Sequence, residues 1–132
     1  MARKRNKQRA LAGILGKDLT RRSRGRCELC GSRQDVRLYE LPPFPDEPDP
    51  DRTVMGCGRC RKWLQGDHID TVGAWFLSSA VWSELPAVRL AAARMLLSCD
   101  DPEDPWLRDA LAVTNVDPET LEFRSDQMSD PS

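Results

Sequence analysis

Two Cys-x-x-Cys pairs constrain this chain more than any other feature. Cys27 and Cys30 form the first pair, Cys57 and Cys60 form the second, and 26 residues separate the pairs. Two residues between two cysteines let the backbone curl so that both sulfurs face one metal ion. Together the pairs supply the four soft ligands that tetrahedral zinc prefers. The sequence therefore predicts one structural Zn²⁺ ion that ties two distant parts of the chain together.

Disulfide bonds and an iron–sulfur cluster are the competing explanations of these pairs. The first ten residues, MARKRNKQRA, are charged and lack the apolar core of a secretory signal, so nothing indicates an oxidising compartment. The spacing also matches neither common ferredoxin pattern. We therefore expect zinc and a reducing, cytoplasmic location, with an iron–sulfur cluster or a redox disulfide left open as alternatives.

Charge is distributed unevenly, although the formal net charge of the 132 residues is only −1. Residues 1–26 contain ten Lys or Arg and one Asp, whereas residues 27–132 contain ten Lys or Arg and twenty Asp or Glu. A dense positive segment suits contact with nucleic-acid phosphates, and the alternative is a solvated tail that aids solubility or docks on the acidic remainder of the chain. The residues expected to contact phosphates are Arg3, Lys4, Arg5, Lys7, Arg9, Arg21, Arg22 and Arg24.

The segment between and after the cysteine pairs predicts a hairpin followed by a helix. Residues 36–41 alternate loosely between apolar and polar side chains and are expected to form a strand, and residues 53–55 are expected to form a short return strand. The proline-rich, acidic segment at 42–52 cannot pair and is expected to be the loop between them. Residues 60–65 contain good helix formers, and Gly66 stands where a helix would stop. A helix after the second pair favours a treble-clef-like module, and a zinc-ribbon β-hairpin remains the alternative.

The C-terminal half is expected to be helical. Residues 87–98 are the clearest helix, with one apolar stripe, Ser83 as the N-cap and Pro86 in the first turn. Asp104 and the proline after it open a second helix at 106–113, whereas residues 67–82 fit a strand and a helix equally well. At least three of the four tryptophans are expected in the core: Trp63, Trp75, Trp82 and Trp106.

These expectations define a small α+β protein in which a four-cysteine zinc module packs against a C-terminal helical part. The predicted parts are a basic arm at 1–18, helical in part, a zinc module at 19–66 containing the loop at 42–52, a helical part at 67–124 and a disordered tail at 125–132. No stretch approaches the length of a transmembrane helix, so we expect no membrane contact.

The residue types argue against an enzyme. Four thiolates around zinc leave no open position for water. Cys99 precedes two aspartates, which raise the pKa of a thiol, and we interpret it as a core cysteine. Asp67, His68 and Asp70 form the only cluster that resembles a hydrolytic site. We interpret this cluster as a capping loop with an exposed histidine, and a weak second metal site is the alternative.

A family resemblance accompanies these motifs. In order, RCELCG, LYELPP, CGRCRKWLQG, VWSELPAVRLAAARML and DPETLEF resemble the PhnA-like zinc-binding proteins over residues 19–123. The resemblance implies that the same four cysteines are zinc ligands, and it does not by itself imply an activity on phosphonates. The long acidic loop and the basic arm depart from many relatives.

A weaker resemblance is to the HNH nuclease scaffold. That scaffold carries a histidine general base on its first strand, where this chain reads LYELP, and the one histidine here is His68. If the scaffold is shared, its chemistry has been lost. The sequence thus predicts a non-enzymatic, macromolecule-binding protein whose partner is nucleic acid or another protein, with a degenerate HNH-like or phosphonate-related hydrolase as the alternative class.

Overall fold

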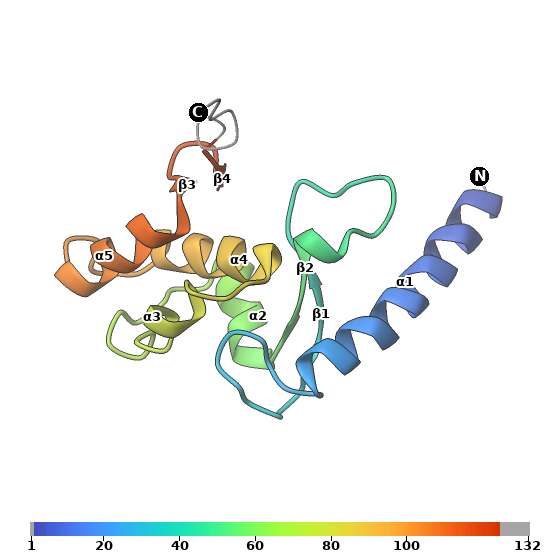
Figure 1. Ribbon diagram of the computed structural model, residues 1–132, viewed down its shortest axis with the longest axis horizontal. Coiled ribbons are helices and arrows are strands. Elements are labelled where there is room, and N and C mark those ends of the chain that lie inside the picture. Colours follow the sequence, from blue (N-terminus) through green and yellow to red (C-terminus); the bar gives the residue numbers. More distant parts are fainter. Residues whose placement is uncertain (1, 125–132) are drawn as a thin grey trace.

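The computed structural model describes the backbone of residues 2–124 and the side chains of residues 13–124, and the predicted tail at 125–132 lies outside them. The elements are α1 (Ala2–Ser23), β1 (Arg37–Glu40), the 3-10 helix η1 (Pro50–Arg52), β2 (Thr53–Gly56), α2 (Gly58–Leu64), α3 (Leu77–Ala80), α4 (Pro86–Leu97), α5 (Pro105–Thr114), β3 (Val116–Asp117) and β4 (Glu122–Phe123). Figure 1 shows α1 on one side of the β1–β2 hairpin and α2, α3, α4 and α5 on the opposite side. The small α+β class is confirmed.

The β1–β2 hairpin forms the layer between α1 and the other helices. The strands are antiparallel, and Leu38 pairs with Met55 and Tyr39 with Val54. All of β2 is buried, because it contacts both α1 and α4. A strand covered on both faces loses the alternation of apolar and polar residues that marks a half-exposed strand.

Helix α4 lies at the centre of the core. It contacts α2, α3, α5, β2 and η1, and eight of its residues are buried. The sequence predicted one apolar stripe along this helix, but the buried surface is wider, because the alanines at 87, 91, 92 and 93 are as buried as the larger side chains. A helix that is apolar on nearly every side is typical of a helix surrounded by packing partners.

Ser83 is not the N-cap of α4. The N-cap is Leu85, whose extended backbone (φ −85°, ψ 117°) immediately precedes Pro86, the first helical residue. A residue before proline is disfavoured in the helical region, so the helix begins at the proline itself. Ser83 instead accepts a hydrogen bond from the Leu85 N–H at its hydroxyl, 3.1 Å away.

The prediction that at least three tryptophans lie in the core is wrong. Trp75 is 58% exposed and Trp82 is 72% exposed, whereas Trp63 and Trp106 are half-buried. Trp75 packs edge-on against Trp106, with ring centroids 5.0 Å apart. The aromatic rings therefore surround the core, and aliphatic side chains of leucine, isoleucine, valine, methionine and alanine fill it.

The loops at 67–76 and 99–104 are joined through Thr71. The Asp100 N–H donates to the Ile69 carbonyl (3.0 Å), and the Asp101 N–H donates to Thr71 Oγ1 (2.9 Å). Thr71 is 4% exposed, and its hydroxyl donates to Asp100 Oδ1. The hydroxyl bond, followed by the bond from the Thr71 N–H, lowers the pKa of the Asp100 carboxyl.

Thr71→Val is expected to lower the free energy of unfolding by about 1–3 kcal/mol, because valine keeps the volume but leaves the Asp101 N–H without its acceptor. Urea denaturation at pH 7 measures the change. Thr20→Val, at an exposed position of α1, is the control and should change stability by less than about 0.5 kcal/mol. Equal effects of the two variants would contradict the role given to Thr71.

The hydrogen bond from the Thr71 hydroxyl to the Asp100 carboxylate makes the stability loss of Thr71→Val depend on pH. Because the pKa of Asp100 is lowered in the folded state, its contribution is present at neutral pH and is lost as the pH falls through the lowered pKa. The stability difference between wild type and Thr71→Val should therefore shrink in acid.

Candidate metal centre

The four predicted cysteines converge on one point. Their sulfur atoms all lie within 4.8 Å of one another, and the Sγ atoms of Cys30 and Cys57 are 3.6 Å apart. A tetrahedral ion with zinc–sulfur bonds of about 2.3 Å would set its sulfurs about 3.8 Å apart, whereas a disulfide needs about 2 Å. All five cysteines of the chain are free thiols. The cluster therefore fits a metal ion held by four sulfurs.

The first pair lies in a tight turn. The Cys27 N–H donates to the Ser32 carbonyl (2.7 Å), and the Gly31 N–H donates to the Cys27 carbonyl (2.9 Å). The Cys30 N–H lies 3.5 Å from Cys27 Sγ and donates to it. Gly31 has a φ of 84°, a region that glycine enters without strain. The turn aims both sulfurs to one side.

The second pair opens helix α2. Cys57 is the N-cap, and its Sγ accepts the Cys60 N–H at 3.5 Å. A helix N-terminus carries partial positive charge, which favours a thiolate there. The helix ends at Leu64 with Gln65 as its C-cap, and Gly66, the residue predicted to stop it, follows with a φ of 115°. The Gly66 N–H donates to the Trp63 carbonyl and the Asp67 N–H to the Lys62 carbonyl.

An ion pair fastens the first turn to both α1 and β2. Arg22 donates from Nε to Glu28 Oε2 (2.7 Å) and from Nη2 to Glu28 Oε1 (2.8 Å). Glu28 Oε1 also accepts the Met55 N–H, and Arg22 Nη2 donates to the Thr53 carbonyl. The Glu28 side chain is only 4% exposed. Sequence reasoning placed Arg22 among phosphate-contacting residues and missed Glu28, because only the fold brings the two together.

The sulfur atoms differ in proton affinity. A hydrogen bond from Cys60 lowers the pKa of Cys27 to about 4, and the same bond, together with burial, raises the pKa of Cys60. Burial raises the pKa of the Cys30 thiol. Four thiolates this close repel one another unless a cation lies between them. A divalent metal ion would supply that cation and stabilise all four in the charged form.

Arginines beside the second pair are held by other groups. Arg61 Nη2 contacts Asp35 Oδ2 at 2.7 Å, and its Nε donates to the Gly56 carbonyl. The Arg59 guanidinium lies over the rings of Trp63 (4.8 Å) and Phe76 (5.1 Å). Asp35, which sequence reasoning also missed, thus braces the metal module through Arg61.

The other candidate residues are spread apart. His68 Nε2 lies 3.3 Å from Asp100 Oδ2, and Asp70 accepts the Val72 N–H. Among the described residues, the four cysteines are the only group of His, Cys, Asp or Glu side chains placed to hold a metal ion. Asp67, His68 and Asp70 are therefore not brought together as a second site. Cys99 is buried, and burial followed by the nearby Asp100 charge raises its pKa to about 11, as expected of a core cysteine.

The predicted phosphate-contacting residues fall into three groups. The backbone of positions 3, 4, 5, 7 and 9 lies in α1, and their side chains are outside the described part of the structure. Arg21 and Arg24 are exposed, and Arg24 ends the helix with a φ of 57°. Arg22 is held by Glu28. Helix α1 also crosses position 18, where the arm was expected to end.

Comparisons with known proteins give no relative. No family model, curated protein or solved structure matches the chain. Within residues 2–124, no helix is both long enough and apolar enough to span a bilayer.

Proposed function

We propose that the four cysteines hold one structural Zn²⁺ ion and that the protein binds a macromolecule without catalysing a reaction. The convergence of four sulfurs, two from the first cysteine turn and two from the start of α2, carries the proposal. A zinc ion with four thiolate ligands has no position left for water or substrate. Its contribution is therefore to fold the module, and any activity has to come from the surface that the module supports.

The order of elements supports a treble-clef-like module. A cysteine turn is followed by the β1–β2 hairpin, and the second cysteine pair opens α2 directly after β2. This arrangement, together with the motifs quoted above, also supports membership of the PhnA-like zinc-binding proteins. Neither proposal assigns a reaction.

Metal analysis and X-ray absorption of the purified protein test the zinc proposal. We expect one zinc per chain with four sulfur neighbours at about 2.3 Å. Stoichiometric iron would favour the iron–sulfur alternative. A nitrogen or oxygen neighbour in the zinc shell would contradict a closed site.

Nucleic acid is the proposed partner, and α1 is its proposed contact. Leu15 and Leu19 anchor the helix on Met55, whereas Lys17 and Arg21 are exposed. Positions 3, 7, 17 and 21 fall on one side of a helix with 3.6 residues per turn. The 22-residue helix is about 33 Å long, and Figure 1 shows its N-terminal half extending away from the rest of the molecule. A row of cations on a projecting helix suits successive phosphates.

A salt titration of DNA and RNA binding tests this contact in the full-length protein. A variant with Arg3, Lys7, Lys17 and Arg21 changed to Gln should bind more weakly, and the slope of log K against log salt should fall by roughly 3. A matched variant changes four exposed cations elsewhere: Arg33, Lys62, Arg108 and Arg124. Its slope should change by less than about 1. No binding by the wild type at low salt would eliminate a nucleic-acid role.

Exposed apolar side chains favour a protein adapter as the second candidate. Val72 is 82% exposed, and Trp75 and Trp82 also face solvent. Exposed apolar and aromatic side chains mark surfaces that bind other proteins, whereas a nucleic-acid surface also needs basic residues close by. If the protein binds nucleic acid through α1, a Trp75→Ala, Trp82→Ala double variant should retain that binding.

A hydrolase that uses His68 is the remaining alternative. It would require that the His68→Ala variant lose any hydrolytic activity detected in the wild type.

A further inference from the structure

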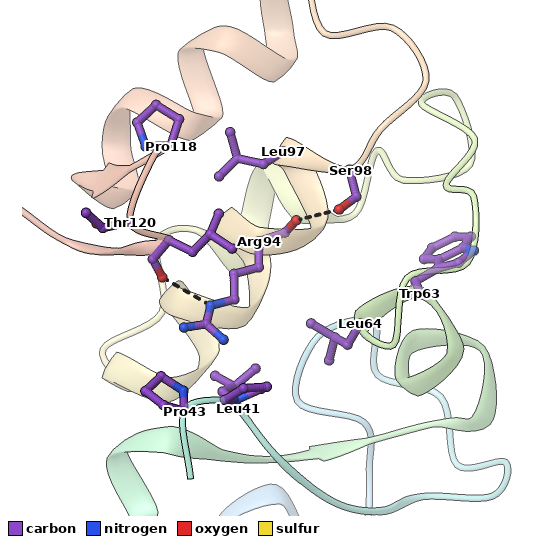
Figure 2. Close-up of a pocket in the computed structure, with 11 residues that line it drawn as sticks. Leu41, Pro43, Trp63, Leu64, Arg94, Leu97, Ser98, Pro118 and Thr120 are labelled. Carbon is purple, nitrogen blue, oxygen red and sulfur yellow. Dashed lines mark hydrogen bonds between the residues drawn. The ribbon is translucent and has the colours of Figure 1, made fainter. Parts of the chain in front are cut away.

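A pocket separate from the cysteine cluster lies where four segments meet. Its volume is about 590 Å³, within the range of small-molecule sites. Figure 2 shows its walls coming from the segment after β1, the end of α2, the last turn of α4 and the turn between β3 and β4. Its wall includes Leu41, Pro43, Leu64, Arg94, Leu97 and Leu121. Most of this wall is apolar, and Arg94 is its charged member.

The charges beside the pocket do not balance. Glu122 forms two ion pairs: its Oε2 lies 3.3 Å from Arg94 Nη2, and its Oε1 lies 2.9 Å from Arg52 Nη1. The side chains of Arg94 and Arg52 are 13% and 20% exposed. Among the described residues, Glu122 is the carboxylate in ion-pair contact with these two poorly solvated guanidinium groups, so about one positive charge has no carboxylate partner there, and such a charge is costly away from water. A single negative charge entering the pocket would relieve that cost.

The Arg94 guanidinium is held in a fixed orientation. Its Nε donates to the Leu121 carbonyl at 3.1 Å, and Leu121 has a φ of 60°, an uncommon region for leucine. Within the described residues, the hydrogen bonds of Arg94 come from Nε and Nη2. Figure 2 shows the guanidinium directed toward Leu41 and Pro43. The Nη1 edge is therefore placed to donate to a ligand that enters between these walls.

We propose that this pocket binds a small monocarboxylate with an apolar body. Its carboxylate accepts hydrogen bonds from Arg94, and its body lies against Leu64, Leu97 and Pro43. A single negative charge matches the excess charge of the two arginines and Glu122. A phosphate dianion would carry more negative charge than this single excess positive charge, and a neutral ligand would not compensate the positive charge at all. The site is independent of zinc and of nucleic-acid binding.

Amide chemical shifts of the ¹⁵N-labelled, zinc-loaded full-length protein test the proposal with 4-phenylbutyrate as the probe. We expect saturable shifts at Leu41, Leu64, Leu97 and Leu121, with the millimolar affinity of so small a ligand. The neutral analogue 4-phenylbutanamide should bind at least tenfold more weakly. Equal affinities for acid and amide would overturn the charge argument, and tighter binding of phenyl phosphate would overturn the assignment to a carboxylate. Absence of saturable shifts would overturn the site.

Two variants locate the bound probe. Ser98→Trp blocks the pocket from an exposed position, and Ser79→Trp, exposed on α3 and outside the pocket wall, is its matched control. Affinity should fall at least tenfold in the first variant and stay unchanged in the second. Arg94→Lys should retain part of the affinity, and Arg94→Met should lose it in a sample whose spectrum shows a folded protein. Unchanged binding by Ser98→Trp would place the ligand elsewhere and overturn the proposal, whatever the fate of Arg94 variants.

Discussion

Cys60→Ser is expected to leave the protein mostly unfolded at 25 °C. Cys60 has no exposed surface, and its sulfur belongs to the four-cysteine cluster. Zinc binding contributes about 10–16 kcal/mol in small zinc-finger peptides, which equals or exceeds the total stability of most small domains. Serine would weaken this binding and leave three crowded thiols at the centre of the module. Circular dichroism and the dispersion of amide proton shifts measure the loss.

Cys99→Ser is the matched control for Cys60→Ser. Cys99 is also buried, but its thiol donates to the Met95 carbonyl (3.4 Å) and lies outside the cluster. We expect this variant to bind zinc, remain folded and lose about 1–2 kcal/mol of stability. Removing metal from the wild type with a chelator should reproduce the unfolding of Cys60→Ser. A native-like spectrum after chelation would show that the module folds without metal.

Arg22→Met is expected to have the second-largest effect. It leaves the Glu28 carboxylate, 4% exposed, without its partner beside the first cysteine turn. Removing one member of a buried ion pair costs about 3–5 kcal/mol, and we expect about 3 because Arg22 is 22% exposed. Urea denaturation measures the loss, and zinc release into a chelating dye should become faster.

A double variant separates the buried charge from the lost packing. Adding Glu28→Gln to Arg22→Met removes the charge but keeps an acceptor for the Met55 N–H, so most of the stability should return. Arg21→Met, at the exposed neighbouring position, should cost less than about 0.5 kcal/mol. If Arg21→Met and Arg22→Met were equally costly, the ion pair would not hold the turn.

The parts of the fold that depend on local chemistry could be predicted from the sequence. Cys-x-x-Cys spacing, the prolines that interrupt pairing at 42–52, and Gly66 after the helix formers each act within a few residues. They indicated the cysteine site, the β1–β2 hairpin and α2, and the structure contains all three. Asp104 likewise caps α5 as expected, accepting the Trp106 N–H at 3.2 Å.

The parts that depend on distant contacts could not be predicted. Hydrophobicity alone places Trp75 and Trp82 in a core, but in the fold aliphatic side chains occupy the core and both rings lie at the surface. Arg22 belongs to a basic run in the sequence, and only the approach of the first cysteine turn makes it a partner of Glu28. The turn at Leu121, which forms part of the pocket wall, could not be predicted either, because Leu121 has a positive φ that leucine rarely adopts and no sequence pattern indicates.

The alanines of α4 also limit how this protein can diverge over generations. Ala87, Ala91, Ala92 and Ala93 have no exposed surface and no side-chain torsion that could absorb a larger group. A replacement there would have to shift a neighbouring backbone, so inherited change is directed to the periphery, where the tryptophans and the charged residues lie. Descendants of this chain could therefore acquire new partners while the interior stays almost the same.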